Sequence, residues 1–325
     1  MTETPYLAAP TGTPQETWFH PLGLALRLVT DSPEILAAAE EVFGGFGPGR
    51  PADTADATFR LFAHDVEELP TEPLLRVDGT LVYQTAGRGA TLVVDRAGGT
   101  AFGYFSRTVL ADRAAFRWHF LDLALFYFLE ERGFLGVHGA ALARAGRGLV
   151  LRAPSGHGKS TLTYAAARRS LQAVAEDIVW IAPDAARIWG LPWTFHLLPD
   201  AARRFPELAD RSPSRQLNGE EKIAIDLEAL RAGSTAASAA AAGVVLLRRR
   251  PGSGSELTEL DPVADWPEIW RDWLAGGASR ERTRPNYDRR AEALLRGRPV
   301  HRLELGDDLD AAVALLEPLL PPEAG

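Results

Sequence analysis

The sequence predicts a chain in two parts, an N-terminal α+β domain with an antiparallel sheet and a C-terminal α/β domain. Two observations lead to this prediction. Apolar and polar residues alternate in short runs over residues 57–106, which is typical of strands with one buried face. In the second half of the chain, strand-like and helix-like segments alternate around a glycine-rich loop at residues 153–161. We expect the boundary to give domains of residues 1–132 and 133–325.

The composition is typical of a packed soluble globule. The 325 residues are 46% hydrophobic and 24% charged, and the net charge of −8 argues against a nucleic-acid partner. The chain has no cysteine, which excludes disulfides, thiolate metal sites and cysteine nucleophiles. No stretch approaches the ~20 apolar residues that span a bilayer. Residues 1–10 lack the pattern of a secretory signal. We therefore expect a cytoplasmic protein without a membrane partner.

The N-terminal part contains clear punctuation for strands and a helix. Residues 17–30 predict one or two strands with a break at Pro21. In residues 31–45, Asp31 or Ser32 can cap a helix that Gly44-Gly45 ends.

Turn and helix signals continue to the predicted domain boundary. Asp78-Gly79 and Gly98-Gly99 lie between strand-like runs and predict hairpins. Residues 111–133 predict one long buried helix that ends at Gly133, and His119 within it is interpreted as a core residue.

The C-terminal part begins with strand, turn, strand, loop, helix and strand. The alanine-rich segment 233–243 is interpreted as a surface linker or a short helix. Arg248-Arg249-Arg250 is expected to end a strand and enter a solvated turn. The remaining elements are strands at 220–225, 243–250 and 299–306, and helices at 226–230, 262–277, 284–297 and 307–320.

The segment APSGHGKST, residues 153–161, is typical of a phosphate-binding loop. It fits the pattern G-x-x-x-x-G-K-[ST] except that Ala153 replaces the first glycine, which is tolerable if that residue keeps a negative φ. Gly156 and Gly158 allow backbone N–H groups to turn toward phosphate at a helix N-terminus. Lys159 would reach the β- and γ-phosphates, and the Ser160 hydroxyl would bind Mg²⁺.

We therefore predict ATP and Mg²⁺ as ligands of this loop, in preference to a chance glycine-rich turn. His157 occupies a variable position and is interpreted as an exposed loop residue without a catalytic role. The predicted nucleotide-binding residues are Ser155, Gly156, His157, Gly158, Lys159, Ser160 and Thr161.

Two further segments bring candidate chemistry to the loop. Glu176-Asp177 ends a strand only one helix after Lys159, where one acid can hold Mg²⁺ and another can accept a proton from a hydroxyl. His138 lies on the strand before the loop strand and can reach these acids if the strands are neighbours. A neutral imidazole there could orient an acid or take part in proton transfer.

Together these residues resemble the HPr kinase/phosphorylase family. That family has a histidine-glycine pair, then a loop of the form x-S-G-x-G-K-[ST], then a double acid. This chain has His138-Gly139, Ser155 to Ser160, and Glu176-Asp177. The Ser-Gly pair in the loop is shared with phosphoenolpyruvate carboxykinases, which have a related nucleotide core. The chain also resembles the HPr-kinase-like proteins of bacterial peptide-modification clusters, including lasso-peptide serine kinases.

The resemblance implies transfer of the γ-phosphoryl group of ATP to a serine or similar hydroxyl, with a peptide or protein acceptor favoured over a small molecule. It implies that Lys159 binds phosphate and Ser160 binds Mg²⁺. Glu176 and Asp177 would divide metal binding and base duty, and His138 would support them. HPr kinases assemble as hexamers, so a homo-oligomer is a further expectation. The resemblance is strong over residues 135–182, weaker over 190–320 and slight before 130.

Departures from the family pattern keep alternatives open. The first acid is glutamate, and Arg187 stands about where the family has a further metal-holding glutamate, so the reverse phosphorylase direction stays open. Lys222 could contact phosphate or substrate, or lie on the surface. The alternatives are a kinase of a small hydroxyl compound, such as free serine or a sugar, and a nucleotide-binding regulator without transfer activity. A GTPase and a transporter-type ATPase are disfavoured because no N-K-x-D or L-S-G-G-Q segment occurs.

Overall fold

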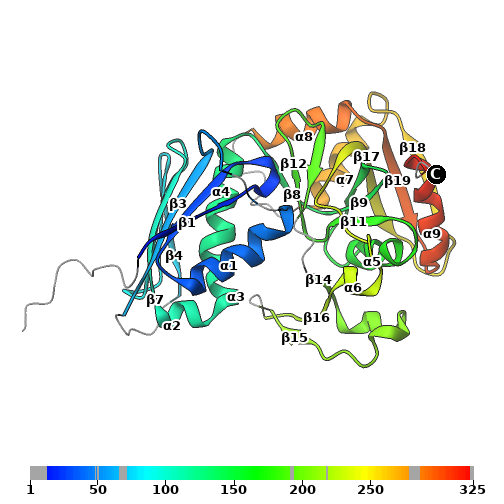
Figure 1. Cartoon of the computed structure of the whole chain (residues 1–325). Coiled ribbons are helices and arrows are strands. Elements are labelled where there is room, and N and C mark those ends of the chain that lie inside the picture. Colours follow the sequence, from blue (N-terminus) through cyan, green and yellow to red (C-terminus); the bar gives the residue numbers. More distant parts are fainter. Residues whose placement is uncertain are drawn as a thin grey trace, which may run out of the picture. The chain divides into compact units, whose positions relative to one another are not determined.

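The structure is a computed structural model that describes residues 13–47, 49, 51–65, 72–190, 194–216, 219–277 and 286–322. The chain divides into two compact units, Met1–Arg132 and Gly133–Gly325, which are both visible in Figure 1. Each unit combines helices with β-sheet. None of the helices in the described residues is long and apolar enough to cross a membrane.

The described residues of the N-terminal unit form a seven-stranded sheet in the order β1-β2-β3-β7-β6-β5-β4. Its strands are β1 (Gln15–Phe19), β2 (Leu26–Thr30), β3 (Ala57–His64), β4 (Leu74–Asp78), β5 (Leu81–Thr85), β6 (Ala90–Asp95) and β7 (Thr100–Ser106). The predicted hairpins are confirmed, since Gly79 and Gly99 adopt positive φ angles of 58° and 67° in the β4–β5 and β6–β7 turns.

The prediction that this sheet is antiparallel is only partly right, because the sheet is mixed. β3 runs parallel to both of its neighbours, β2 and β7, whereas the other neighbouring strands are antiparallel. Helix α1 (Pro33–Phe43), which Ser32 caps by accepting the Ile35 N–H, connects β2 to β3. A helical crossover returns the chain to the same end of the sheet and so makes neighbouring strands parallel. The alternation of apolar residues reports which face is buried, but it does not report strand direction.

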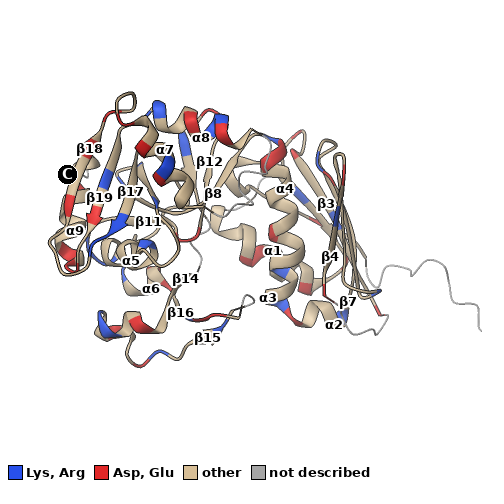
Figure 2. Cartoon of the chain, turned by 180° about the vertical axis from the view of Figure 1, so that it is seen from behind, with Lys and Arg blue, Asp and Glu red and all other residues tan. Residues whose placement is uncertain are grey.

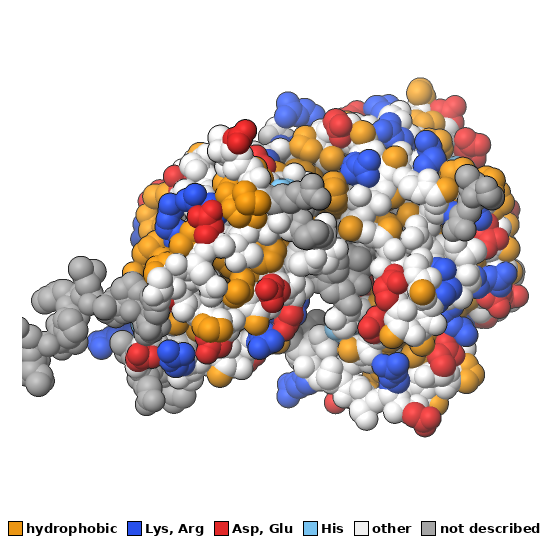
Figure 3. All heavy atoms as spheres, in the orientation of Figure 1, with side chains coloured by type: hydrophobic (Ala, Val, Ile, Leu, Met, Phe, Trp, Pro, Cys, Tyr) orange, Lys and Arg blue, Asp and Glu red, His pale blue; other side chains and the backbone are white. Residues whose placement is uncertain are grey.

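The two faces of this sheet differ in their covering. Phe59 and Phe105 point to the face that the helices cover, with ring centroids 5.4 Å from Phe128 and 4.9 Å from Phe120. Phe102 alternates to the other face and is 44% exposed. Orange hydrophobic side chains are visible over this unit in Figure 3. The sheet therefore buries one face, as the period of two predicts.

The predicted single helix over residues 111–133 is also wrong in detail. The segment folds as α2 (Arg107–Ala111), α3 (Arg113–Phe116), the π-helical turn Arg117–Asp122 and α4 (Leu123–Glu131). Two capping side chains explain the separate starts, because Ser106 accepts the Val109 N–H and Asp112 accepts the Ala115 N–H. The predicted stop is confirmed, since Gly133 follows α4 with a φ of 90°.

The C-terminal unit is built on a nine-stranded sheet. The main path is β11-β9-β10-β17-β13-β12-β8, and β19 pairs with β17 and β18. The strands are β8 (Leu135–His138), β9 (Ala140–Arg144), β10 (Arg147–Arg152), β11 (Gln172–Ala175), β12 (Ile178–Ile181), β13 (Arg187–Trp189), β17 (Ser238–Arg249), β18 (Glu256–Leu260) and β19 (Val300–Leu305). Because β10, β17 and β19 are parallel, their carboxyl ends lie at one edge of the sheet.

The alanine-rich segment 233–243 is not a linker or a helix. Most of it belongs to β17, which lies in the middle of the sheet. A Cβ atom added at Gly148 of the neighbouring β10 would lie 2.9 Å from the Cβ of Ala239, so space is tight at this crossing. Small side chains fit there, and tertiary packing overrides the helix propensity of alanine.

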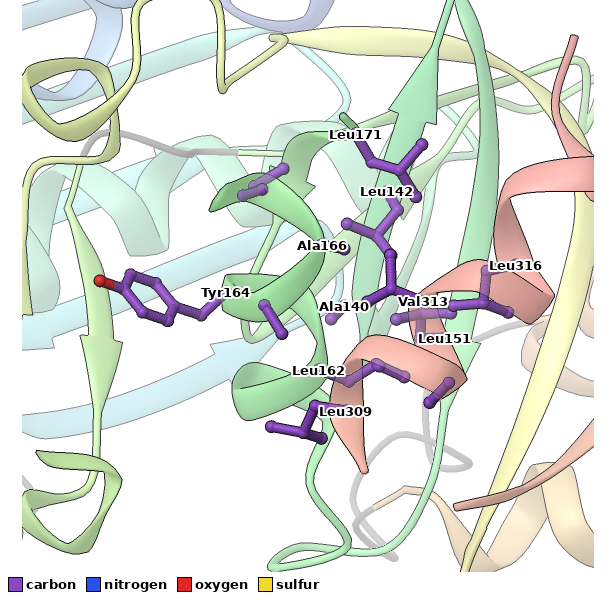
Figure 4. Close-up of a cluster of buried hydrophobic side chains, with 14 of the residues drawn as sticks. Ala140, Leu142, Leu151, Leu162, Tyr164, Ala166, Leu171, Leu309, Val313 and Leu316 are labelled. Atoms are coloured by element: carbon purple, nitrogen blue, oxygen red, sulfur yellow. The ribbon is translucent and has the colours of Figure 1, made fainter. Parts of the chain in front are cut away.

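Helices cover both faces of this sheet. On one face α5 (Lys159–Arg169) and α9 (Leu309–Leu316) pack on Leu142 and Leu151, as Figure 4 shows. On the other face α7 (Trp266–Ala275) and α8 (Tyr287–Arg296) pack on Val150, which alternates away from Leu151. Burial on both faces leaves the strand ends as the places where polar side chains can emerge.

The basic run 248–250 ends β17, as predicted, and is marked in blue in Figure 2. Its arginines pair with acids of the same unit. Arg248 contacts Glu268 and Asp272, and Arg249 contacts Asp307. The arginine run therefore takes part in ion pairs within the C-terminal unit.

A small sheet completes the C-terminal unit. It has the order β14-β16-β15, with strands β14 (Phe195–Leu197), β15 (Ser214–Arg215) and β16 (Glu221–Ile225). The predicted strand and helical turn at 220–230 are confirmed as β16 and α6 (Leu227–Leu230). The side chains of Phe195 and Leu197 join the same core cluster as α5, so the alternate residue, His196, points elsewhere.

Candidate active site

One cavity in the C-terminal unit brings most of the predicted site residues together. It is lined by His138, Ser155, Gly156, Gly158, Lys159, Ser160, Thr161, Glu176, Asp177, His196, Leu197, Leu198, Asp200, Glu220 and Lys222. We name residues 153–161 with His138 and Asp177 the loop wall. We name His196 to Leu198, Asp200, Glu220 and Lys222 the strand wall. Glu176 lies where the two walls meet.

The loop wall follows from the strand, loop and helix that the sequence predicts. β10 ends at Arg152, and α5 begins at Lys159 after the left-handed Gly158, whose φ is 90°. Gly156 is also left-handed, with a φ of 78°, whereas Ala153 has a negative φ and is buried. The departure at Ala153 is therefore tolerated for the expected reason. The first backbone N–H groups of a helix have no carbonyl acceptor within the helix, so the start of α5 is suited to an anion.

Lys159 is held inside the loop wall. Its Nζ donates to the carbonyl oxygens of Ala153 at 2.9 Å and Pro154 at 3.3 Å, and it lies 3.1 Å from Nε2 of His138. The residue is only 6% exposed. These contacts therefore hold the ammonium group of Lys159 in one place beside the loop.

His138 links Lys159 to Asp177. Antiparallel pairing of β8 and β12 sets His138 opposite Ile178, and its Nδ1 lies 3.0 Å from Oδ1 of Asp177. Because an ammonium can only donate, Nε2 accepts from Lys159, and Nδ1 of a neutral ring then donates to Asp177. This bond holds the pKa of Asp177 below its ordinary value, and the charges of Lys222 and Lys159 act in the same direction.

Glu176 has different surroundings from its neighbour in the chain. Its Oε2 accepts the backbone N–H of His196 at 2.8 Å and lies 3.4 Å from Nδ1 of that ring. The side chain of Glu176 is 14% exposed, whereas that of Asp177 is 62% exposed. The two acids therefore lie in different environments.

Arg152 supports the loop wall from behind, and sequence analysis missed it. This side chain is 1% exposed and donates to the carbonyl oxygens of His138 and Trp273 and to the Tyr287 hydroxyl. Its guanidinium also lies over the Trp273 ring, 4.8 Å from the centroid. A buried charge with this many partners fixes the end of β8 against α7 and α8. The only signal in the sequence was an arginine closing an apolar strand.

Sequence analysis also missed most of the strand wall. His196, Leu198, Asp200 and Glu220 line the cavity, although no motif marks them. Lys222, which the sequence left open, lies in this wall, and its Nζ is 3.3 Å from Oε2 of Glu220.

Three residues named from the sequence do not line the cavity. His157 contacts the carbonyl oxygen of Ser155 through Nδ1, at 3.1 Å, and its ring does not line the cavity. Arg187 lies on β13 and donates to the hydroxyl of Ser238. His119 belongs to the N-terminal unit, where burial lowers its pKa. The segment compared with the family at Arg187 continues into residues 191–193, which lie outside the described residues.

The oxygen donors of the cavity fit Mg²⁺. The hydroxyl of Ser160 and the carboxylates of Glu176, Asp177 and Asp200 all line it. Mg²⁺ is usually bound through one or two carboxylates together with substrate phosphates. Among the described residues no group of three or more His, Asp or Glu side chains could hold a metal ion.

Comparison with known proteins adds little to this geometry. No protein-family profile and no curated protein sequence matches the chain. Among solved structures, the Hpr(Ser) kinase/phosphatase from Coxiella burnetii is similar, with a TM-score of 0.29 and 11% identity. The similarity covers 57% of this chain and 96% of that chain. At this TM-score the likeness between the two folds is weak.

Proposed function

We propose that the protein transfers the γ-phosphoryl group of ATP to the hydroxyl of a serine, or a similar hydroxyl, in a peptide or protein. The observation that carries this proposal is the single cavity that contains the loop wall, Lys159 and the His138–Asp177 pair. The serine acceptor follows from the resemblance in sequence, and phosphoryl transfer is supported by the geometry.

The loop wall binds the nucleotide. Backbone N–H groups of the loop and of the first turn of α5 would surround the phosphates, and Lys159 would exchange its carbonyl contacts for phosphate oxygens. The hydroxyl of Ser160 and a carboxylate that lines the cavity would hold Mg²⁺, which neutralises charge on the phosphates.

The transfer step needs a proton acceptor beside the incoming hydroxyl. The acceptor oxygen forms a bond to the γ-phosphorus while the bond from that phosphorus to the β–γ bridging oxygen breaks, and ADP leaves. The hydroxyl proton passes to a carboxylate of the strand end, for which the ionised Asp177 is placed. His138 orients this carboxylate through Nδ1.

Labelled ATP tests the proposal directly. The protein is incubated with Mg²⁺ and γ-labelled ATP, and the macromolecular and small-molecule fractions of a source-cell extract are added separately. We expect label to enter the macromolecular fraction with the wild-type protein and not with Lys159→Ala. Label that enters only small metabolites would show that the acceptor is a small molecule and not a peptide or protein. Binding of ATP without transfer to either fraction would favour a regulator.

A further inference from the structure

The two adjacent acids of the site are engaged by two different histidines. Asp177 is 62% exposed and is bonded to His138 of the loop wall. Glu176 is 14% exposed, and one of its oxygens receives the backbone N–H of His196 and lies near its ring. A carboxylate that is mostly shielded and already accepting a main-chain N–H has less freedom to meet a ligand than an open one.

The partner of Glu176 belongs to a separate sheet. His196 lies on β14, which pairs with β16 through Leu197 and Ile223, and β16 carries Lys222. The described strands of this small sheet form no ladder with the nine-stranded sheet. The carboxylate of Glu176 is therefore a polar tie between the end of β11 and the strand wall.

β14 is held on its other side by apolar packing, and the hydrogen bond to Glu176 adds to that packing. Phe195 and Leu197 are buried in the cluster that packs on α5, and the Phe195 ring lies 6.2 Å from that of Tyr164. Apolar burial fixes the depth of β14, but it leaves the position along the core surface less constrained because it is not directional. A hydrogen bond to a charged acceptor is directional, so it can fix this position.

Given the proposed function, on which this step rests, we propose that Glu176 is a positioning residue that acts through His196 to hold the strand wall. Asp177 is then the one acid of the pair that meets the reacting groups. Glu176 acts as an acceptor of the His196 N–H, and a neutral group of the same shape can do the same. Asp177 acts as a charge.

The variants Glu176→Gln and Glu176→Ala separate these roles, because glutamine keeps an oxygen for the His196 N–H and alanine does not. Hydrogen exchange of the His196 amide measures the hydrogen bond to Glu176 directly, and it needs no phosphate-accepting substrate. We expect exchange about 10- to 100-fold faster in Glu176→Ala and unchanged in Glu176→Gln. Glu221→Ala, which removes an exposed carboxylate from the same small sheet, is the matched control and should leave this exchange unchanged. Thermal melts establish that each variant is folded.

Two functional readouts complete the test. The Mg²⁺ dependence of ATP binding should be the same in Glu176→Gln as in the wild type. Transfer of label should fall less than about threefold in Glu176→Gln and by about 100-fold or more in Asp177→Asn. Loss of transfer in Glu176→Gln equal to that in Asp177→Asn would overturn the proposal, as would unchanged exchange in Glu176→Ala. If the wild type transfers no phosphate, the proposed function fails, and the exchange and Mg²⁺ measurements still decide the role of Glu176.

Discussion

The two walls of the cavity are built in different ways. The loop wall follows directly from strands of the nine-stranded sheet. Its side chains and backbone are hydrogen-bonded to one another, since Lys159 bonds to the Ala153 carbonyl oxygen and to His138. The strand wall rests on strands of three, five and two residues, and its Leu198 is 49% exposed. The contrast indicates that the loop wall is more tightly fixed than the strand wall, as we expect if the loop wall holds the proposed nucleotide.

The largest expected effect comes from removing the charge at the open acid of the loop wall. Asp177→Asn keeps the shape of the side chain but cannot take the acceptor proton, so transfer should fall by about 10²- to 10⁴-fold. Steady-state transfer of labelled phosphate measures this loss. If Asp177→Asn retained more than a tenth of wild-type activity, the proton acceptor would have to be a group other than Asp177.

Truncation of the shared core should cost different amounts of stability on its two sides. Leu151 of β10 and Leu197 of β14 are both buried in the core cluster that packs on α5. Leu151→Ala should lower the free energy of unfolding by about 2–5 kcal/mol, because the surrounding sheet cannot move to fill the void that the removed side chain leaves. Leu197→Ala should cost less, because its three-residue strand can shift. Urea unfolding of both variants makes the comparison, and an equal loss would show that the strand wall is as rigid as the loop wall.

Gly158 offers a test confined to the loop wall. Alanine there would be strained at a φ of 90°, and its Cβ would lie 3.0 Å from Cδ2 of Leu305. We expect Gly158→Ala to lower stability by about 1–2 kcal/mol and to weaken ATP binding. Gly146 is the matched control, because it has a φ of 73° in the β9–β10 turn and nothing within 4 Å of an added Cβ. Gly146→Ala should carry a similar strain and leave ATP binding unchanged, which calorimetry can check.

The smallest effect is expected on the strand wall. Lys222→Met removes a partly exposed charge that helps to lower the pKa of Asp177. Because a partly exposed ion pair contributes about 1 kcal/mol or less, transfer should fall by about fivefold at most. Separate KM values for ATP and for the acceptor show which ligand Lys222 contacts. A rise in the KM for ATP would indicate contact with phosphate, and a rise in the KM for the acceptor would indicate contact with that substrate. A loss as large as that of Asp177→Asn would mean that the two walls contribute equally.

Much of the loop wall could be predicted from the sequence because its residues are local. A strand, a glycine-rich loop and a helix follow one another, so Gly158, Lys159 and Ser160 are placed by their spacing alone. Glu176 and Asp177 follow at the end of the next strand. The position of His138 was predicted wrongly in one respect, because β9 lies between β8 and the loop strand β10 in the chain, and β8 and β10 are not neighbours. His138 reaches Asp177 because β8 pairs with β12.

The strand wall could not be predicted because its residues meet only through tertiary packing. His196 lies on a strand of three residues, which is too short to carry a recognisable alternation. The same limit explains the alanine-rich β17, whose place in the middle of the sheet depends on the tight crossing with Gly148. Strand direction in the N-terminal sheet was missed because side-chain alternation is identical in parallel and antiparallel strands with one buried face.

Equilibrium binding of ATP in the presence of Mg²⁺ tests the central claim most directly. Calorimetric titration of the wild-type protein should give saturable binding at one site. Lys159→Ala, checked for folding by circular dichroism, should bind at least about tenfold more weakly, because a charge-assisted bond to phosphate is lost. Equal binding by the two proteins, or no binding by the wild type, would contradict the assignment of the loop wall as the nucleotide site.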